Sequence, residues 1–313
     1  MSLSTQSAHG GEERYFAEAN KYALPSALVL TRSKTFWEPA KLGGVLWRAV
    51  IHPLRFMQVR SLVQQPLLAE VAQVNPRFAY KYLTREYLLL GINTEARAAS
   101  FLHHYKRLLA AIPEKPLRRM LLSDLPLFET AHDGRSVRIT LGMSRPYDKE
   151  GELSLNLEVD REIVFRLSFT LVPGRVVRSR ADEVLLITRS QGVKAAFPQI
   201  QLATRAMHQV APRTILLAAA QGVAAAFGVS EVVAVNAARQ SSYKPELTAI
   251  YTKAYDYFFT ERGLCVAADG LYTGSMPIPA RPLALIQPAN RRRTRRKRAF
   301  RQHVQLACAG FLG

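Results

Sequence analysis

The spacing of hydrophobic residues changes near Pro126, and this change constrains the order in which helices and strands follow each other. Before it, residues 36–125 repeat apolar side chains at helical spacing, most clearly in residues 94–112. After it come short runs rich in Val, Ile, Leu, Phe and Thr, separated by turns that contain Gly, Pro or Asp. The sequence therefore predicts an α+β protein, with an N-terminal helical region followed by a mixed, mostly antiparallel sheet.

Two residues predict where helices of this region begin or break. Thr94 is the expected N-cap of the helix over residues 94–112, because a threonine hydroxyl can accept a hydrogen bond from a free N–H of the first turn. Pro53 is expected to divide the basic stretch 41–65 into two short helices, since proline has no N–H to donate. That stretch either rests on an anionic bilayer or packs into the core with its arginines in solvent.

The β-rich part predicts three or four antiparallel strands, from the runs 136–144, 152–160, 162–172 and 183–190. A helix follows, in which residues 215–227 are apolar almost all round and are therefore expected to be buried. Gly228 is its expected C′ residue. The next run, 230–237, is expected to lie parallel to the preceding strand, because a helical crossover joins parallel neighbours.

Composition limits the class of protein and its location. The chain has 313 residues and a formal charge of +19, which attracts polyanions such as nucleic acid, anionic lipid or lipopolysaccharide phosphate. Two cysteines are too few for a disulfide scaffold or a C-x-x-C zinc site, which indicates a reducing compartment. The N-terminus lacks a secretory pattern and no apolar run reaches spanning length. We expect a cytoplasmic protein that is peripheral to any membrane it binds.

The C-terminal segment concentrates the positive charge. Eight basic residues lie between Arg291 and Arg301, and no acidic residue follows Asp269. We expect a basic tail over residues 289–313, unless Phe300, Val304, Leu306 and Ala307 form the apolar side of a helix, and we expect its removal to leave the fold intact. The expected contacts with an anionic membrane surface or another polyanion are made by Arg291, Arg292, Arg293, Arg295, Arg296, Lys297 and Arg298. The remaining expected divisions are a poorly ordered segment 1–35, a helical region 36–125 and a mixed α/β domain 126–288.

An acidic stretch interrupts this basic chain. Asp148, Glu150 and Glu152 lie at a turn and strand entrance, and Glu158 and Asp160 follow in the strand. Because alternate strand residues share a face, Glu150 and Glu152 could hold a cationic group, polarise an amine or bind a divalent ion. They could equally pair with surplus arginines on the surface, where replacement of both by Gln would cost only about 0–1 kcal/mol.

Other catalytic signatures are missing. His103 and His104 are adjacent, so on a helix they do not face each other, and the other histidines have no partner at metal-ligand spacing. We therefore expect no transition-metal site. Neither a Gly-x-Ser-x-Gly elbow nor a Gly-x-x-x-x-Gly-Lys-Ser/Thr loop occurs, which argues against common serine hydrolases and nucleotide hydrolases.

Four segments resemble the VirK/YbjX family of Gram-negative bacteria, a domain of unknown function. They are "DKEGELSLNL" at 148–157, "RSQG" at 189–192, "HQVAPRTILL" from His208 and "YDYFF" at 255–259. The chain departs from the family pattern where a His-Gly-Leu-Arg-Pro-Lys run and a Trp at position 259 are usual. The resemblance implies a role in virulence, in resistance to cationic antimicrobial peptides and in envelope organisation, and it implies no particular reaction.

The order of elements also resembles an acyl-CoA N-acyltransferase (GNAT-like) domain. This resemblance implies a coenzyme A thioester as cofactor, with its pyrophosphate at the turn that holds Arg189, Gln191, Gly192 and Lys194. The full glycine pattern of that loop is absent, so the segment could equally be a bare turn. Tyr255, or failing that Tyr251, would protonate the departing thiolate, beside Glu150 and Glu152 as further catalytic groups. Packing alone also explains these tyrosines.

Three functional interpretations remain open. The first is a protein peripheral to the inner membrane that supports envelope integrity through acyl or aminoacyl transfer to an amine or lipid head group. The second is a non-enzymatic adaptor that binds anionic lipid or an envelope protein. A nucleic-acid protein ranks third, because no reading motif accompanies the arginines. An open cleft between the strand ending at Arg189 and the strand 231–235 would favour the enzyme, and a gap filled by side chains would favour the adaptor.

Overall fold

The computed structural model describes residues 44, 47–145 and 149–312 of the chain. The expectation of a poorly ordered segment over residues 1–35 lies outside the described residues, and so does Asp148. A continuous hydrophobic core runs through the described part, from Val59 in the first helices to Cys308 near the C-terminus.

Helices occupy the first part of the described chain, as predicted. Residues 47–51 are helical, His52 is the N-cap of the next helix and Pro53 is its first residue, so proline divides this stretch as expected. The N-cap at the longest of these helices is Asn93 rather than Thr94, because the Asn93 side chain accepts the hydrogen bond from Ala96 N. The helices are α3 (Pro53–Val63), α4 (Pro66–Val74), α5 (Thr94–Ala111) and α6 (Glu114–Ser123).

An eight-stranded mixed sheet follows, in the order β1-β2-β3-β4-β5-β6-β8-β7. Strands β1 to β5 form an antiparallel meander, β6 is parallel to β5, and β8 is antiparallel to β6. The predicted α+β class is therefore confirmed. The strands are β1 (Leu125–His132), β2 (Arg135–Met143), β3 (Leu153–Val159), β4 (Glu162–Pro173), β5 (Glu183–Gly192), β6 (Glu231–Ala234), β7 (Cys265–Val266) and β8 (Tyr272–Ser275).

Helices connect and cover the second half of the sheet. They are α7 (Phe197–Ala206), α8 (Pro212–Ala226), α9 (Thr248–Thr252), a π-helical turn η7 (Lys253–Tyr257), α10 (Phe258–Glu261) and α11 (Pro288–Ala309). Helix α8 is buried between the sheet and α11, as its apolar sequence predicts, and Gly228 closes it with φ +70°. Because a Cβ on Gly222 of α8 would lie 2.2 Å from the Gln305 carbonyl oxygen, α8 and α11 touch backbone to backbone.

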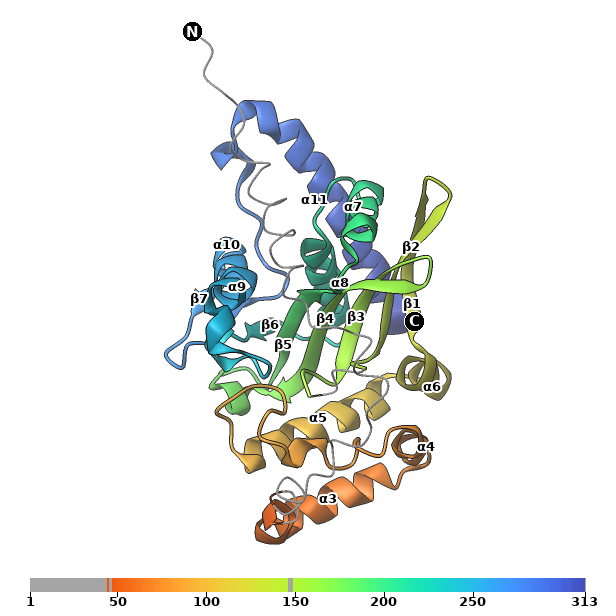
Figure 1. Cartoon of the computed structure of the whole chain (residues 1–313), viewed down its shortest axis with the longest axis vertical. Coiled ribbons are helices and arrows are strands. Elements are labelled where there is room, and N and C mark those ends of the chain that lie inside the picture. Colours follow the sequence, from red (N-terminus) through yellow and green to blue (C-terminus); the bar gives the residue numbers. More distant parts are fainter. Residues whose placement is uncertain (1–43, 45–46, 146–148, 313) are drawn as a thin grey trace.

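Cross-strand pairing gives β2–β5 two contrasting faces. The apolar face carries rows such as Leu141–Leu155–Leu167, and α7 and α8 pack against it. At the far end of the strands, α5 crosses the sheet (Figure 1) and His104 Nδ1 accepts a hydrogen bond of 3.1 Å from Leu171 N. The second face, which we call the polar face, carries Thr140, Asn156, Arg166 and Gln191 in one row and Gly142, Ser154, Ser168 and Arg189 in the next.

Candidate functional site

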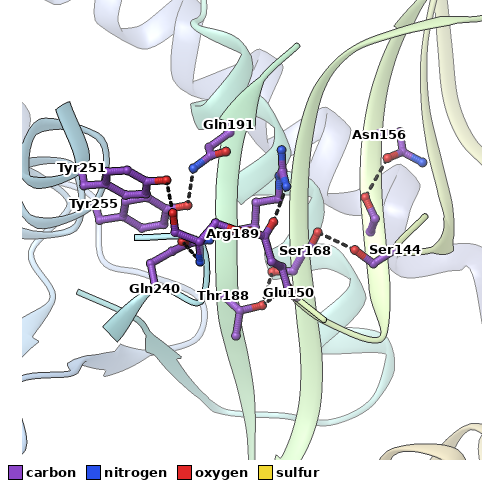
Figure 2. Close-up of polar contacts among 12 residues, drawn as sticks. Ser144, Glu150, Asn156, Ser168, Thr188, Arg189, Gln191, Gln240, Tyr251 and Tyr255 are labelled. Carbon is purple, nitrogen blue, oxygen red and sulfur yellow. Dashed lines mark hydrogen bonds and ion pairs between the residues drawn. The ribbon is translucent and has the colours of Figure 1, made fainter. Parts of the chain in front are cut away.

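Glu150 is buried at the entrance to β3 and holds together three separate parts of the chain (Figure 2). Its carboxylate forms an ion pair with Arg189 of β5 and accepts hydrogen bonds from Gln240 Nε2, at 2.9 Å, and from the Ser242 hydroxyl. Its carbonyl oxygen accepts from the Thr188 hydroxyl. The carboxylate is therefore fully engaged by groups from β5 and from the segment after β6.

Glu152 has a different set of partners. Its carboxylate lies 2.5 Å from Lys81 Nζ and accepts hydrogen bonds from the hydroxyls of Tyr87 and Tyr105. The side chains of Glu152 and Lys81 are only 0% and 2% exposed. Glu152 therefore connects the sheet to the N-terminal helices.

The two carboxylates diverge because strand alternation does not extend back to Glu150. Strand β3 begins at Leu153, and Gly151 has φ +142°, in a region that side-chain-bearing residues rarely adopt. Each carboxylate is held by its own cation, and both pairs are buried. The small cost expected for replacing surface partners therefore does not apply to them. Within the described residues, no group of three or more His, Cys, Asp or Glu side chains is placed to hold a metal ion.

Strands β5 and β6 separate beyond Ile187. Their parallel pairing ends at Ile187 and Ala234, after which β5 continues toward Gln191 paired with β4 on one side and with no strand on the β6 side. Tyr255 occupies the space beside this free part of β5, with no exposed surface, and Gln191 Nε2 donates a 3.0 Å hydrogen bond to its hydroxyl. Tyr251 stacks on Tyr255 with ring centroids 6.1 Å apart. Side chains therefore fill the gap that was expected to decide between the enzyme and the adaptor.

Burial also changes the acidity of both phenols. Desolvation, with a smaller contribution from the Glu150 charge, raises the pKa of Tyr251 to about 12 and raises the pKa of Tyr255 further. The Tyr251 hydroxyl donates to the Ser242 carbonyl oxygen at 2.6 Å. Both hydroxyls are therefore protonated at neutral pH, which suits a proton donor, but neither opens onto solvent.

The residues expected at a phosphate-binding turn take up different positions. Gln191 and Gly192 are the last residues of β5 and pair with Arg166 and Phe165 of β4, so they belong to the strand and not to the turn. A Cβ on Gly192 would point at Ile200 and Phe165. Arg189 is engaged by Glu150. Of the four, Lys194 lies in the turn before α7 and is exposed.

Sequence analysis missed most of the polar face. The Ser144 and Ser168 hydroxyls lie 2.9 Å apart, and the Ser154 hydroxyl donates to Asn156 Oδ1 at 2.7 Å (Figure 2). The alternation of polar with apolar residues in residues 136–160 predicts strands. It also indicates that polar side chains from neighbouring strands gather on one side, where they form a hydrogen-bonding surface.

The basic C-terminal segment is a helix. In α11, Val304 and Cys308 are buried against α8 and Phe300 is half-buried, whereas Leu306 is exposed. The segment is therefore the amphipathic helix that was the alternative to a tail, with Cys308 in place of Leu306, and this packing argues against the expectation that its removal leaves the fold intact. Its first half extends beyond the sheet (Figure 1). Arg291 and Arg298 donate to backbone carbonyls of the preceding loop. The exposed arginines of this half, which we call the basic half of α11, are Arg292, Arg293, Arg295 and Arg296.

An exposed apolar ridge lies at the opposite end of the molecule from the basic half of α11 (Figure 1). Trp47 is 65% and Leu54 is 79% exposed, and Val50, Ile51 and Met57 continue the ridge at helical spacing. The later part of α3 packs into the core, as one interpretation of the stretch 41–65 predicts, whereas the side chains of the ridge are exposed. That the ridge rests on a bilayer stays a prediction. Within the described residues, no helix is both long and apolar enough to cross a bilayer.

Comparison with known protein families gives one match. Residues 41–309 match the family model described as "Protein of unknown function (DUF535)". The protein belongs to the DUF535 family. The matched part of this DUF535 protein contains the polar face, the two buried carboxylate networks and α11. No curated protein and no solved structure matches the chain.

Proposed function

We propose that this DUF535 protein is a non-enzymatic adaptor of the bacterial envelope that binds an anionic membrane surface through the basic half of α11. The observation that carries this proposal is the anchoring of four exposed arginines on one helix, whose other half is packed on α8 through Val304 and Cys308. The resemblance to the VirK/YbjX family supports a role in resistance to cationic antimicrobial peptides and in virulence.

Electrostatics favours such binding. A Lys or Arg near an anionic leaflet contributes roughly 1 kcal/mol, so four arginines on one helix contribute several kcal/mol before saturation. No acidic residue follows Asp269, so no carboxylate on α11 opposes this attraction. The interaction is screened by salt, because the charges are exposed. The apolar ridge lies at the opposite end of the molecule, so one flat membrane cannot contact it and the basic half of α11 together.

The test is co-sedimentation of the full chain with vesicles. Vesicles that contain phosphatidylglycerol should pellet the protein at low salt, and neutral phosphatidylcholine vesicles should not. Replacement of Arg292, Arg293, Arg295 and Arg296 by Gln should abolish pelleting with the fold retained. The matched control replaces four exposed cations elsewhere, Arg175, Arg178, Arg180 and Lys244, by Gln and should bind as the unaltered chain does.

Two outcomes would overturn the assignment to α11. Equal loss of binding in both quadruple variants would show that binding depends on the overall charge of the protein and not on α11. Loss of binding in Leu54→Ser/Met57→Ser, with the α11 variant unaffected, would move the membrane contact to the apolar ridge. Tighter binding to duplex DNA than to anionic vesicles at the same salt concentration would favour the nucleic-acid interpretation.

Acyl or aminoacyl transfer from a coenzyme A thioester to an amine or lipid head group is the second candidate. The divergence of β5 from β6, with the Tyr255 hydroxyl hydrogen-bonded to Gln191 beside it, favours this reaction. The thioester would have to displace Tyr255 from the gap, which argues for the adaptor. Acetyl coenzyme A should raise the melting temperature if the enzyme interpretation holds, and Lys194→Glu should remove that shift. The absence of any shift in the unaltered chain would leave the adaptor.

A further inference from the structure

A cavity of about 410 Å³ lies over β2 and β3 on the polar face, beside the end of α6. This volume lies within the range of small-molecule sites. Its lining includes five charged side chains, Arg119, Asp124, Arg138, Glu158 and Arg161, together with Thr140. Cationic and anionic groups therefore meet in one cavity.

Asp124 has an unfavourable backbone conformation in this cavity. It follows the last residue of α6 with φ 62° and ψ 138°, a combination that suits glycine. Its side chain lies directly on Gly142 of β2, where a Cβ would be 1.6 Å from Asp124 Oδ1. Because Gly142 has no side chain, the Asp124 carboxylate can occupy the space above β2. Asp124 itself has a backbone conformation that is typical of glycine.

The charge of Asp124 is poorly compensated. The carboxylate stands at the C-terminal end of α6, where the helix dipole is negative. Among the described residues it forms neither a hydrogen bond nor an ion pair. Burial, followed by the nearby charge of Glu158, raises the pKa of Asp124, and the more weakly acting guanidinium groups of Arg145, Arg166 and Arg138 oppose this rise. A local arrangement that is unfavourable in several independent ways indicates a functional residue.

The other charged groups of the cavity are of two kinds. Arg138 and Glu158 are hydrogen-bonded to each other at its base, whereas Arg119 and Arg161 lie at its exposed rim. Arg138 donates to one oxygen of Glu158 at 2.6 and 2.9 Å, and the Thr140 hydroxyl donates to the other oxygen at 2.7 Å. Arg119 and Arg161 are exposed, and within the described residues neither guanidinium group has a hydrogen bond or ion pair. A carboxylate and two guanidinium groups are therefore available to a ligand.

We propose that this cavity binds a compact zwitterion, whose ammonium group lies against Asp124 and whose carboxylate or phosphate lies against Arg119 and Arg161. The ammonium group forms the ion pair that the Asp124 carboxylate does not make within the described residues, and the oxyanion accepts hydrogen bonds from Arg119 and Arg161. Both α-amino acids and aminoethyl phosphates have this chemistry. The proposal goes beyond the membrane contact, because it uses none of the arginines of α11.

The test measures binding by calorimetry with four probes: O-phosphoethanolamine, glycine, ethanolamine and inorganic phosphate. One of the two zwitterions should bind at one site per chain at least about tenfold more tightly than ethanolamine or phosphate alone. The preferred zwitterion distinguishes a phosphate ester from an amino acid. Affinity should fall as the pH falls through the raised pKa of Asp124, because the ligand then loses its counter-charge.

Variants assign the site. Asp124→Asn should weaken binding at least about tenfold without loss of fold, and Arg119→Gln/Arg161→Gln should do the same through the oxyanion. The matched control is Asp133→Asn, another aspartate at positive φ, in the turn between β1 and β2. No binding of either zwitterion at about 10 mM, unchanged affinity in both cavity variants, or phosphate binding as tightly as the zwitterion would overturn the proposal. If Asp124→Asn does not fold, the arginine variant decides.

Discussion

Replacing Glu152 by Gln is expected to destabilise the protein strongly, although the change is nearly isosteric. The Glu152 carboxylate forms an ion pair with Lys81, and both side chains are almost completely buried. Removal of one charge from a buried pair leaves the other charge uncompensated, at a cost of about 3–5 kcal/mol. This is a large part of the roughly 5–15 kcal/mol that stabilises a typical folded protein.

The hydroxyls of Tyr87 and Tyr105 add to this expectation. Both donate to the Glu152 carboxylate, one to each oxygen. A glutamine offers one carbonyl oxygen, so one buried hydroxyl loses its acceptor, which by itself costs about 1–3 kcal/mol. The two effects share the same groups and do not add fully, so the overall expectation remains about 3–5 kcal/mol.

Urea denaturation followed by circular dichroism measures the change, provided that the m-value is unchanged. Glu95→Gln is the control, because Glu95 pairs with Arg55 at the surface and should lose only about 0–1 kcal/mol. Lys81→Met combined with Glu152→Gln should recover stability relative to Glu152→Gln alone, since no buried charge then remains. A loss below about 1 kcal/mol for Glu152→Gln, or no recovery in the double variant, would refute the reasoning.

Three further predictions concern packing and pH. Gly222→Val should cost about 1–3 kcal/mol in the free energy of unfolding, because its side chain would push α11 from α8, whereas Gly310→Ala meets nothing within 4 Å and should be neutral in the same urea titration. Deletion of residues 291–313 should lower the melting temperature markedly, because it removes Val304 and Cys308, which are buried against α8, and an unchanged melting temperature would contradict the packing of α11. Burial holds the pKa of His104 in the folded protein well below 6.5. As the pH falls below about 6.5, the unfolded chain therefore binds a proton at His104 before the folded protein does, and the free energy of unfolding should fall. His104→Gln should make this fall smaller.

The spacing of apolar residues predicts those helices and strands in which the buried side can be inferred from neighbouring residues alone. Strands β2 to β5 and the buried helix α8 were identified because their apolar residues recur with the period of one secondary structure. The change of period near Pro126 does not predict strand β1, because a proline usually marks the end of an element but is tolerated at the start of an edge strand. The N-cap differed by one residue, since Asn93 and Thr94 both carry suitable oxygens and only the backbone conformation selects between them.

The candidate sites depend on register, which the sequence does not reveal. The acidic stretch draws attention to Glu150, but its partner Gln240 lies in a distant segment and no local pattern connects the two. The cavity beside α6 needs Asp124 to lie on Gly142, and this contact arises only from the way in which α6 meets β2. Neither residue is distinctive in the sequence, because an aspartate after a helix and a glycine in a strand are each common.

The backbone contact between α8 and α11 has a consequence for protein synthesis. Helix α8 is apolar on nearly all sides, and the side that Gly222 presents is covered by residues near the C-terminus. A ribosome therefore completes α8 well before its cover exists, and this side remains open to water until α11 has left the exit tunnel. Exposed apolar surface in an incomplete chain favours aggregation, so a chaperone that shields α8 during translation would act when the protein is most vulnerable.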